Sequence, residues 1–308
     1  DEAVIATVTL NPAVDRTLVV PHFAVGRTNR VQDERTDVGG KGINVARMAR
    51  RLDCPVIATG FLAGPRGRSI ARTLSAEGIL TDFVEVGGET RVNLKIVDPE
   101  SGTETEINEP GPRIEPTDLA ALVDRIETLA PRCPVVVFSG SLPPGAPPDT
   151  YAHLIAVARR HGARTILDAA GEALALGIAA GPDLVKPNRA EAEELLGTPL
   201  GSDEQLLKAA RTLLDRGPHA VAISLGSAGA LLVTGGDGVW RARPPVFRPA
   251  GTVGAGDAMV AAFACAFLNA SPWREALRLA TGAGSASAAA DGTALSEWLR
   301  QVSVEEVA

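Results

Sequence analysis

Cysteine and histidine are scarce in this 308-residue chain, and neither occurs in a pattern typical of a metal site. The three cysteines are odd in number, widely separated and set among apolar residues, so we expect buried, reduced thiols in a cytoplasmic protein. The four histidines lack His-Glu-x-x-His spacing, and no Cys-x-x-Cys pair occurs. The residues concerned are Cys54, Cys133, Cys265, His22, His153, His161 and His219. The sequence therefore gives no indication of a zinc-type centre.

The chain also lacks an excess of positive charge and any long hydrophobic run. Its formal net charge is -7 and its pI is about 5.3, which argues against a general affinity for nucleic acid or an anionic membrane. The longest apolar run, residues 258–268, is too short to span a bilayer, and no signal segment opens the sequence. With 45% hydrophobic residues, we expect one α/β domain over residues 1–308 and a small-molecule partner.

Two common phosphate-binding motifs are absent. The Rossmann fingerprint requires a third glycine where this chain has Met259, and a strand where it has the proline-rich residues 244–249. The Walker A motif fails because Gly40-Lys41 has no glycine five positions before Gly40 and is followed by Gly42 instead of Ser or Thr. A nucleotide would have to be held in another way.

Residues 251–257, Gly-Thr-Val-Gly-Ala-Gly-Asp, run directly into an apolar stretch with helical spacing. A helix beginning near Asp257 would direct its unpaired N–H groups and positive dipole end into the space left by Gly254 and Gly256, which suits an anion. Bound phosphate would repel a carboxylate there unless the carboxylate has a task, such as accepting a proton from an attacking hydroxyl. Asp257 is therefore a candidate catalytic base, although it could simply cap its helix.

A second glycine-rich corner follows the first predicted strand, residues 4–10. Residues 11–15 are expected to form a turn that presents Asp15 at the strand end. Further along, glycines would let a ligand approach the backbone at the start of a helix, where a lysine and an asparagine add polar groups. The corner consists of Asp15, Gly39, Gly40, Lys41, Gly42 and Asn44. The alternative is that the glycines only make a tight turn.

Residues 90–97 and 103–108 alternate between apolar and polar side chains on either side of a turn-rich connection, which predicts a hairpin. Arg91 and Asn93 belong to its polar face, with Lys95. Because the hairpin interrupts a series of strand–helix units, we expect it to form a small lid over a site. An ordinary edge hairpin with solvated charges is the alternative.

From residue 134 onward, short apolar runs alternate with helical segments near residues 149–161, 188–197 and 202–216. Runs that are apolar on both faces and alternate with helices imply a parallel sheet covered on both sides. The loops after such strands meet at the carboxyl edge of the sheet. Those loops are residues 139–145, 168–172, 186–191 and 224–229.

Four motifs in this order resemble those of the ribokinase-like (PfkB-type) carbohydrate kinases. They are Val38 to Arg47, Lys186-Pro187-Asn188-x-x-Glu191, Ser224-Leu225-Gly226-x-x-Gly229, and Thr252 to Asp257. The resemblance runs from about Thr7 to Thr293. It implies an α/β fold, a three-layer sandwich with a mostly parallel central sheet and a small β-sheet lid, whose strands would be inserted at about residues 12–38 and 88–110.

The resemblance also implies a role for individual residues in the phosphorylation of a sugar by ATP. Asp257 would be the catalytic base, and Gly254, Ala255 and Gly256 would form the anion hole for the transferred phosphoryl group. Contacts to ATP would come from Lys186, Asn188, Ser224, Gly226, Ser227, Gly229, Thr252 and Gly256, with Asn188 and Glu191 organising Mg²⁺ through water. Asp15, Gly39, Gly40, Asn44, Asn93 and Ser139 would hold the sugar, and Arg91, Arg27 and Lys41 its existing phosphate.

The narrower resemblance is to the phosphosugar branch of the family. The glycine corner with Lys41 resembles that of 1-phosphofructokinases and tagatose-6-phosphate kinases more than that of minor 6-phosphofructokinases. The stretches 90–95 and 252–257 look most like those of bacterial 1-phosphofructokinases, so the expected reaction is the ATP-dependent conversion of fructose 1-phosphate to fructose 1,6-bisphosphate. Tagatose-6-phosphate kinase and minor 6-phosphofructokinase are the alternatives within the branch. A silent sugar-phosphate sensor is the alternative outside it, and would need neither a base nor a metal organiser.

A homodimer is expected as well. The lid hairpin would expose an apolar face at Val92, Leu94 and Ile96. The lid of a second subunit could cover this face, as apolar patches of that kind often mark an interface.

Overall fold

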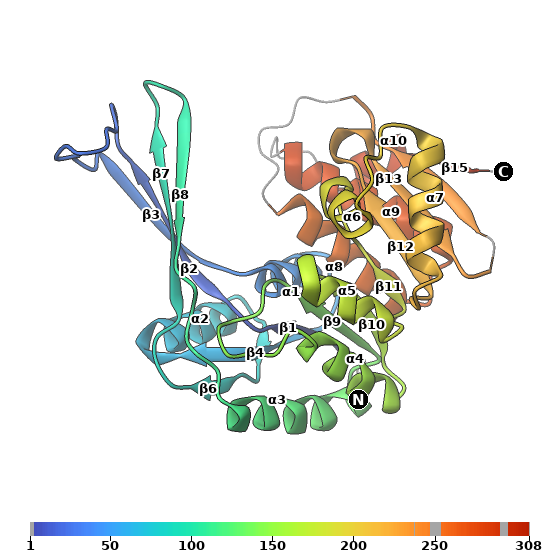
Figure 1. The fold of residues 1–308 in the computed structure, drawn as a ribbon, viewed down its shortest axis with the longest axis horizontal. Helices are drawn as coiled ribbons and strands as arrows, with labels where there is room; N and C mark the ends of the chain where they lie inside the picture. The colour runs from blue at the N-terminus through green and yellow to red at the C-terminus, as the bar shows by residue number, and fades with distance from the viewer. Residues whose placement is uncertain (1–2, 237, 247–253, 290–294, 308) are drawn as a thin grey trace.

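The computed structural model describes residues 3–236, 238–246, 254–289 and 295–307. These residues form an 11-stranded sheet and a separate four-stranded sheet. Figure 1 shows the smaller sheet projecting from a layered main body that contains the larger one. We call the four-stranded sheet the lid.

Parallel strands make up most of the large sheet, in the order β12-β11-β10-β9-β1-β4-β5, with β6 beside β4. Strands β13, β14 and β15 extend it in antiparallel fashion beyond β12. The strands are β1 (Ile5–Thr9), β4 (Val56–Ala63), β5 (Leu80–Thr81), β6 (Val84–Val86), β9 (Val135–Ser139), β10 (Arg164–Asp168), β11 (Leu184–Val185), β12 (Ala220–Ser224), β13 (Ala230–Thr234), β14 (Val239–Arg243) and β15 (Ser303–Glu306). The carboxyl ends of the parallel strands meet at one edge, where the loops that follow them gather.

Helices cover both faces of the large sheet and complete three layers. Strand β9 illustrates the arrangement, because Val136 and Phe138 join the core on one face while Val135 and Val137 join the core on the other. The first core contains residues from α3 (Pro116–Leu129), α4 (Thr150–Arg160), α5 (Gly171–Ala179), α6 (Arg189–Leu196) and α7 (Asp203–Leu214). The second contains residues from α1 (Lys41–Arg51), α2 (Gly64–Ala76), α8 (Ala255–Leu268) and α9 (Trp273–Ala289), with α10 (Leu295–Gln301) packed beside it.

The lid has the strand order β3-β2-β7-β8. Its strands are β2 (Ala13–Val19), β3 (Asp33–Gly39), β7 (Arg91–Asp98) and β8 (Thr103–Asn108), and only the β2–β7 pair among them is parallel. In register, Asp15 lies opposite Asp37 on one side and opposite Asn93 on the other. Since residues directly across a ladder share a face, these three side chains form one row on the lid.

The structure confirms the expected fold class, a mostly parallel sheet between helices with a separate small sheet. The expected turn over residues 11–15 is wrong, because the bend covers only Leu10 and Asn11 and Asp15 is the third residue of β2. Sequence reasoning also missed α3, α5 and the antiparallel strands. Helix α5 has the sequence GEALALGIA, which has no regular polar face to mark a helical repeat.

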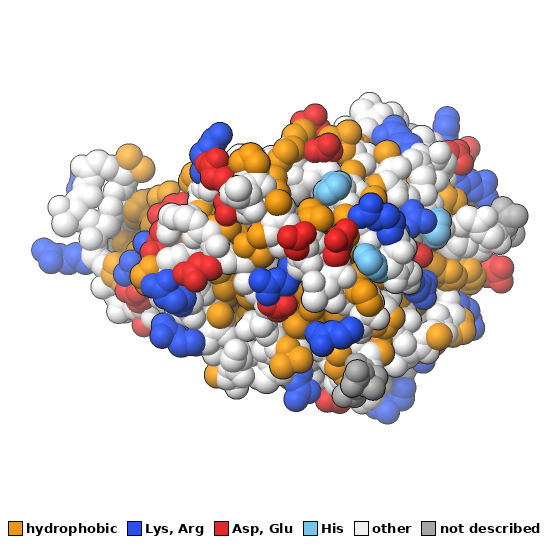
Figure 2. Space-filling view, turned by 90° about the horizontal axis from the view of Figure 1, so that it is seen from below, with side chains coloured by type: hydrophobic (Ala, Val, Ile, Leu, Met, Phe, Trp, Pro, Cys, Tyr) orange, Lys and Arg blue, Asp and Glu red, His pale blue; other side chains and the backbone are white. Residues whose placement is uncertain are grey.

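The composition also led to expectations about surface charge, membrane-spanning helices and the cysteines. Figure 2 shows acidic and basic side chains interspersed over the face seen from below. Each helix in the described part of the chain is too short or too polar to cross a membrane. Cys54, Cys133 and Cys265 are free and buried, as expected.

Candidate active site

Two adjoining cavities occupy the space between the lid and the carboxyl edge of the large sheet. The inner cavity, bounded by residues from β12, α8 and α9, has a volume of about 660 Å³. The lid cavity, bounded by residues from β2, β3, β7 and α1, has a volume of about 630 Å³. Asn44, Asn93 and Gly254 line both, so the two cavities meet at the start of α8.

The first turn of α8 provides the anion-binding corner of the inner cavity. Gly254 is the N-cap, with φ +82°, and the helix opens with a hydrogen bond from the Ala258 N–H to the Gly254 carbonyl at 2.9 Å. The N–H groups at the start of a helix have no partner within it, and they carry the positive end of its dipole. Lys186 Nζ lies 3.5 Å from where a Cβ on Gly256 would be. Backbone dipoles and an ammonium group therefore favour an anion at the same point.

Asp257 lies in this first turn with only 7% of its surface exposed. Its Oδ2 accepts a hydrogen bond of 2.8 Å from Asn44 Nδ2, which fixes the carboxylate relative to α1. Burial raises the pKa of Asp257 to about 6, with a further increase from Asp168, while Asn44, Lys41 and Lys186 oppose the shift. A buried carboxylate whose pKa lies near neutrality is suited to accept a proton and release it again.

Asp168, which was not assigned a role from the sequence, lies at the centre of the charged groups. It ends β10, is 1% exposed, and its Oδ1 is 3.6 Å from both Lys41 Nζ and Lys186 Nζ. That oxygen has no hydrogen-bond partner among the described residues. Although burial opposes charge on Lys41, Asp168 and Glu191 raise its pKa above the ordinary value. The only sequence signal for Asp168 was an acidic residue at a strand end.

The loop after β12 forms another wall of the inner cavity. Ser224, Gly226, Ser227 and Gly229 all line it, as their positions at the carboxyl edge led us to expect. Gly229 has φ +88°, and a Cβ there would clash with the Ala242 carbonyl, so this turn requires glycine. Thr252, the remaining residue expected to contact ATP, lies outside the described residues.

Small side chains on α9 line the same cavity and were missed by the sequence analysis. They are Thr281, Gly284, Ser285 and Ala288. These residues leave room between α8 and α9, where a larger side chain at position 284 would clash with Met259. These residues carry no charged group or candidate base that would single them out in the sequence, because they contribute only the space that they leave.

Asn188 and Glu191 satisfy each other as a capping box at the start of α6. The Asn188 N–H donates to Glu191 Oε2 and the Glu191 N–H donates to Asn188 Oδ1, both at 2.8 Å. Glu191 Oε1 is turned toward Lys41 Nζ, 4.0 Å away, and both residues line the inner cavity. The described residues contain no cluster of three or more His, Cys, Asp or Glu side chains that could hold a metal by themselves.

The lid side of the cleft presents the sugar-binding residues expected from the sequence. Asp15 Oδ1 accepts a hydrogen bond of 3.0 Å from Asn93 Nδ2, and burial raises the pKa of Asp15 above its ordinary value. A Cβ on Gly39 would clash with the Asp15 carboxylate. Gly40, with φ +119°, approaches Pro12 closely at the start of α1. The backbone therefore passes directly behind a carboxylate that faces the lid cavity.

Three further residues were expected to contact the acceptor, and the structure brings only one of them to the cleft. Arg91 lines the inner cavity, but its Nε and Nη2 already donate to the Asn11 carbonyl, at 3.2 and 3.0 Å. Arg27 is exposed in the connection before β3 and lines neither cavity. Ser139 is fully buried at the end of β9 and also lines neither. Of these three, only Arg91 is brought to the cleft.

Comparison with known proteins agrees with this geometry. Residues 8–299 match the family model described as pfkB family carbohydrate kinase. The chain therefore belongs to the pfkB family of carbohydrate kinases. It is 44% identical to the 1-phosphofructokinase of Rhodobacter capsulatus, over 90% of this chain and 88% of that protein. It is 38% identical to the 1-phosphofructokinase of Bacillus subtilis (strain 168), over 97% of each chain.

Among solved structures, the chain resembles phosphofructokinase-2 from Escherichia coli in complex with potassium. The TM-score is 0.90 at 30% sequence identity, and the match covers 97% of this chain and 99% of that one. The likeness therefore spans the main body and the lid together.

Proposed function

We propose that this protein transfers the γ-phosphoryl group of ATP to fructose 1-phosphate and forms fructose 1,6-bisphosphate. Similarity over nearly the whole chain to relatives named 1-phosphofructokinase supports the substrate. One structural observation carries the chemistry: a buried Asp257, fixed by Asn44, beside the open N-terminus of α8 and Lys186. A binding protein would have no need of such a base.

The reaction follows from these positions. Asp257 accepts the proton of the C6 hydroxyl as that oxygen attacks the γ-phosphorus, and the bond from this phosphorus to the bridging oxygen of ATP breaks, which leaves ADP. The N–H groups of the first turn of α8, with Lys186, stabilise the oxygens of the transferring group as charge redistributes. Asn44 holds the base in line.

ATP occupies the inner cavity in this proposal. Its phosphates lie toward Lys186 and the start of α8, while Ser224, Gly226, Ser227 and Gly229 lie along the nucleotide. Mg²⁺ would neutralise part of the charge of the phosphates, and it usually keeps several waters and takes few protein ligands. The Oε1 of Glu191 fits such a site, because it faces the cavity while Oε2 and Asn188 are engaged in the helix cap.

The acceptor lies across the junction of the two cavities. Asp15 and Asn93 bind sugar hydroxyls, and Gly40 lets the sugar approach the backbone. Gly39, which lines neither cavity, makes room for the Asp15 carboxylate, while Lys41 and Arg91 face the existing phosphate of the sugar. Lys41 is only partly exposed and Arg91 has no carboxylate partner in the described chain, so a phosphate could join Arg91 without displacing an ion pair.

A homodimer through the lid is part of the proposal. The apolar face expected at Val92, Leu94 and Ile96 is not exposed, because Ile96 is buried and Val92 and Leu94 are half-buried. Other large apolar side chains of the lid are exposed instead: Val25 at 93%, Val31 at 51% and Ile107 at 54%. Apolar surface on a projecting sheet favours association with a second lid. Light scattering at micromolar concentration tests this, and a monomer would contradict it.

The substrate is tested by ADP release with Mg-ATP and a panel of acceptors. The panel contains fructose 1-phosphate, fructose 6-phosphate, tagatose 6-phosphate, fructose and ribose. The highest kcat/KM is expected with fructose 1-phosphate. Preference for a 6-phosphate would overturn the substrate but keep the chemistry, and binding of phosphosugar without any ADP release would identify a sensor.

A further inference from the structure

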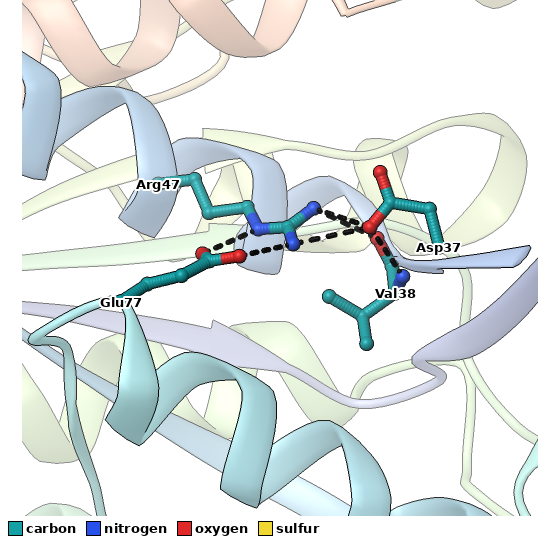
Figure 3. Close-up of polar contacts among 4 residues, drawn as sticks. All are labelled: Asp37, Val38, Arg47 and Glu77. Atoms are coloured by element: carbon teal, nitrogen blue, oxygen red, sulfur yellow. Dashed lines mark hydrogen bonds and ion pairs between the residues drawn. The ribbon is translucent and has the colours of Figure 1, made fainter.

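Arg47 of α1 joins three separate parts of the molecule (Figure 3). Its Nε and Nη2 donate to the two carboxylate oxygens of Glu77, at 2.7 and 2.5 Å. Its Nη1 and Nη2 both donate to Asp37 Oδ1 at 3.1 Å, and Nη1 also donates to the Val38 carbonyl at 3.2 Å. Glu77 is the C-cap of α2, whereas Asp37 and Val38 belong to lid strand β3. Arg47 therefore connects the lid to two helices of the main body.

The same helix also reaches the catalytic groups. Lys41, Asn44 and Arg47 are spaced three apart, so they follow one side of α1 over two turns. Lys41 Nζ lies 3.6 Å from Asp168, Asn44 donates to Asp257 at 2.8 Å, and Arg47 holds Asp37. One rigid helix thus carries contacts to the nucleotide side, to the base and to the lid.

The lid segment that Arg47 holds leads directly into the acceptor corner. Val38 is followed by Gly39 and Gly40, and Gly39 packs against the Asp15 carboxylate with no room for a side chain. Asp37 lies opposite Asp15 in the β2–β3 ladder. A shift of Asp37 and Val38 would therefore move Gly39 and Asp15 relative to Asn44 and Asp257.

We propose that Arg47 is a positioning residue that fixes the base of the lid against α1 and so aligns the acceptor with Asp257. The inference rests on the proposed sugar kinase activity. Arg47 lines the lid cavity, and its hydrogen bonds go to Glu77, Asp37 and Val38 instead of to Asp257 or Lys186. Arg47 gives affinity for the acceptor and leaves the nucleotide, which is held by the large sheet, unaffected.

A second arginine pair, in the main body, provides a contrast. Arg160 Nη2 of α4 donates to Glu127 Oε1 of α3 at 3.2 Å, so this pair also joins two elements. However, the two side chains are 65% and 45% exposed, against 17% for Arg47, and neither residue lines the inner cavity or the lid cavity. The Arg160 pair therefore lies outside the cleft.

The test is the Arg47→Met variant, assayed with varied acceptor and with varied ATP. Methionine keeps an unbranched side chain in the same space but removes five N–H donors. We expect the KM for the acceptor to rise at least about tenfold and the KM for ATP to stay within about twofold, since several charge-assisted bonds are lost on the lid side only. The matched Arg160→Met variant, at a residue that lines neither cavity, should leave both values within about twofold.

One further variant, Asp37→Asn, keeps the inference open to contradiction. Asp37→Asn retains the Arg47–Glu77 pair and weakens only the link to the lid, so it should show the same split between the two KM values, to a smaller degree. If Arg47→Met does not fold, Asp37→Asn decides the matter. An unchanged acceptor KM, or an equal rise in both KM values, would overturn the inference.

Failure of the proposed function would be seen separately. The wild-type enzyme is first assayed with the acceptor panel, and the variants are then compared with whichever acceptor it turns over best. A different preferred acceptor would revise the substrate without affecting the Arg47 comparison. Light scattering on each variant establishes that it has the same oligomeric state as the wild type.

Discussion

The two sheets contribute to the cleft in different ways. The large sheet is covered on both faces, and the charged groups that the main body brings to the cleft are almost fully buried, with Asp257 at 7%, Lys186 at 3% and Asp168 at 1% exposed. The lid is thin, every residue of β8 is exposed, and its polar row is held by side-chain hydrogen bonds such as that from Asn93 to Asp15.

This difference suggests a division of roles, with catalysis in the main body and acceptor recognition on the lid. Groups that exchange charge need a fixed, low-dielectric surrounding, and the core of the main body supplies it. Groups that recognise the acceptor lie on a sheet whose position depends on a few polar links. Changes in the main body should therefore affect turnover, and changes in the lid should affect the acceptor KM.

The largest expected effect is on the main-body side. Asp257→Asn keeps the shape of the side chain but removes the base, so kcat should fall at least about a hundredfold. Affinity for ATP, measured by titration calorimetry, should change little, because Lys186 and the start of α8 remain. A near-normal kcat of Asp257→Asn would show that Asp257 is not the catalytic base.

The same variant should be more stable than the wild type. Burial raises the folded-state pKa of Asp257 to about 6 from its ordinary value of 3.8, so the native state disfavours the ionised carboxylate. The ionised carboxylate therefore lowers the free energy of unfolding, by nothing below the unfolded-state pKa and by the full amount above the folded-state pKa. Because Asp257→Asn cannot ionise, its free energy of unfolding should be higher than that of the wild type by on the order of 2 kcal/mol above pH 6. Thermal unfolding at pH 8 and at pH 4.5 measures it, and an equal gain at both pH values would contradict the cause.

A lid-side change should produce the opposite kinetic pattern. In Gly39→Ala the added methyl group would meet the Asp15 carboxylate, so the acceptor KM should rise at least about tenfold while the ATP KM stays close to normal. Gly87→Ala is the matched control, because a Cβ there meets nothing within 4 Å and should leave both values unchanged. A comparable rise in the ATP KM of Gly39→Ala would contradict the claim that changes in the lid affect only the acceptor.

The smallest expected effect is a shift in pH dependence. Asn44 donates to the Asp257 carboxylate and thereby lowers its pKa. Asn44→Leu should raise that pKa further above about 6, and so move the acid limb of kcat/KM upward by on the order of half a unit. A profile measured from pH 5 to pH 8 detects this, and a downward shift would contradict the assignment.

Residues with a local sequence signature could be predicted. The glycines before Asp257 and the alternating lid hairpin follow from their spacing, whereas Asn188 and Glu191 followed from the resemblance to the carbohydrate kinases. The structure places all of them at the cleft or on the lid. The parallel sheet was predictable for the same reason, since each strand is a short apolar run.

Contacts between distant residues could not be predicted. Arg47, Asp37 and Glu77 are ordinary surface charges in the sequence, and only the folded chain brings them within hydrogen-bond distance. Asp168 gains its importance from two lysines that lie far from it along the chain. Ser139 shows the reverse, because a strand-end serine that looked available is buried beneath the edge.

The most direct test of the central claim is the pH profile of kcat/KM for the wild type beside that of Asp257→Asn. If Asp257 is the base, the wild-type value should fall about tenfold per unit below a pKa of about 6, as the carboxylate is protonated. The residual activity of Asp257→Asn should be flat over the same range. If the variant retains the acid limb, another group accepts the proton, and the mechanism proposed for the start of α8 is wrong.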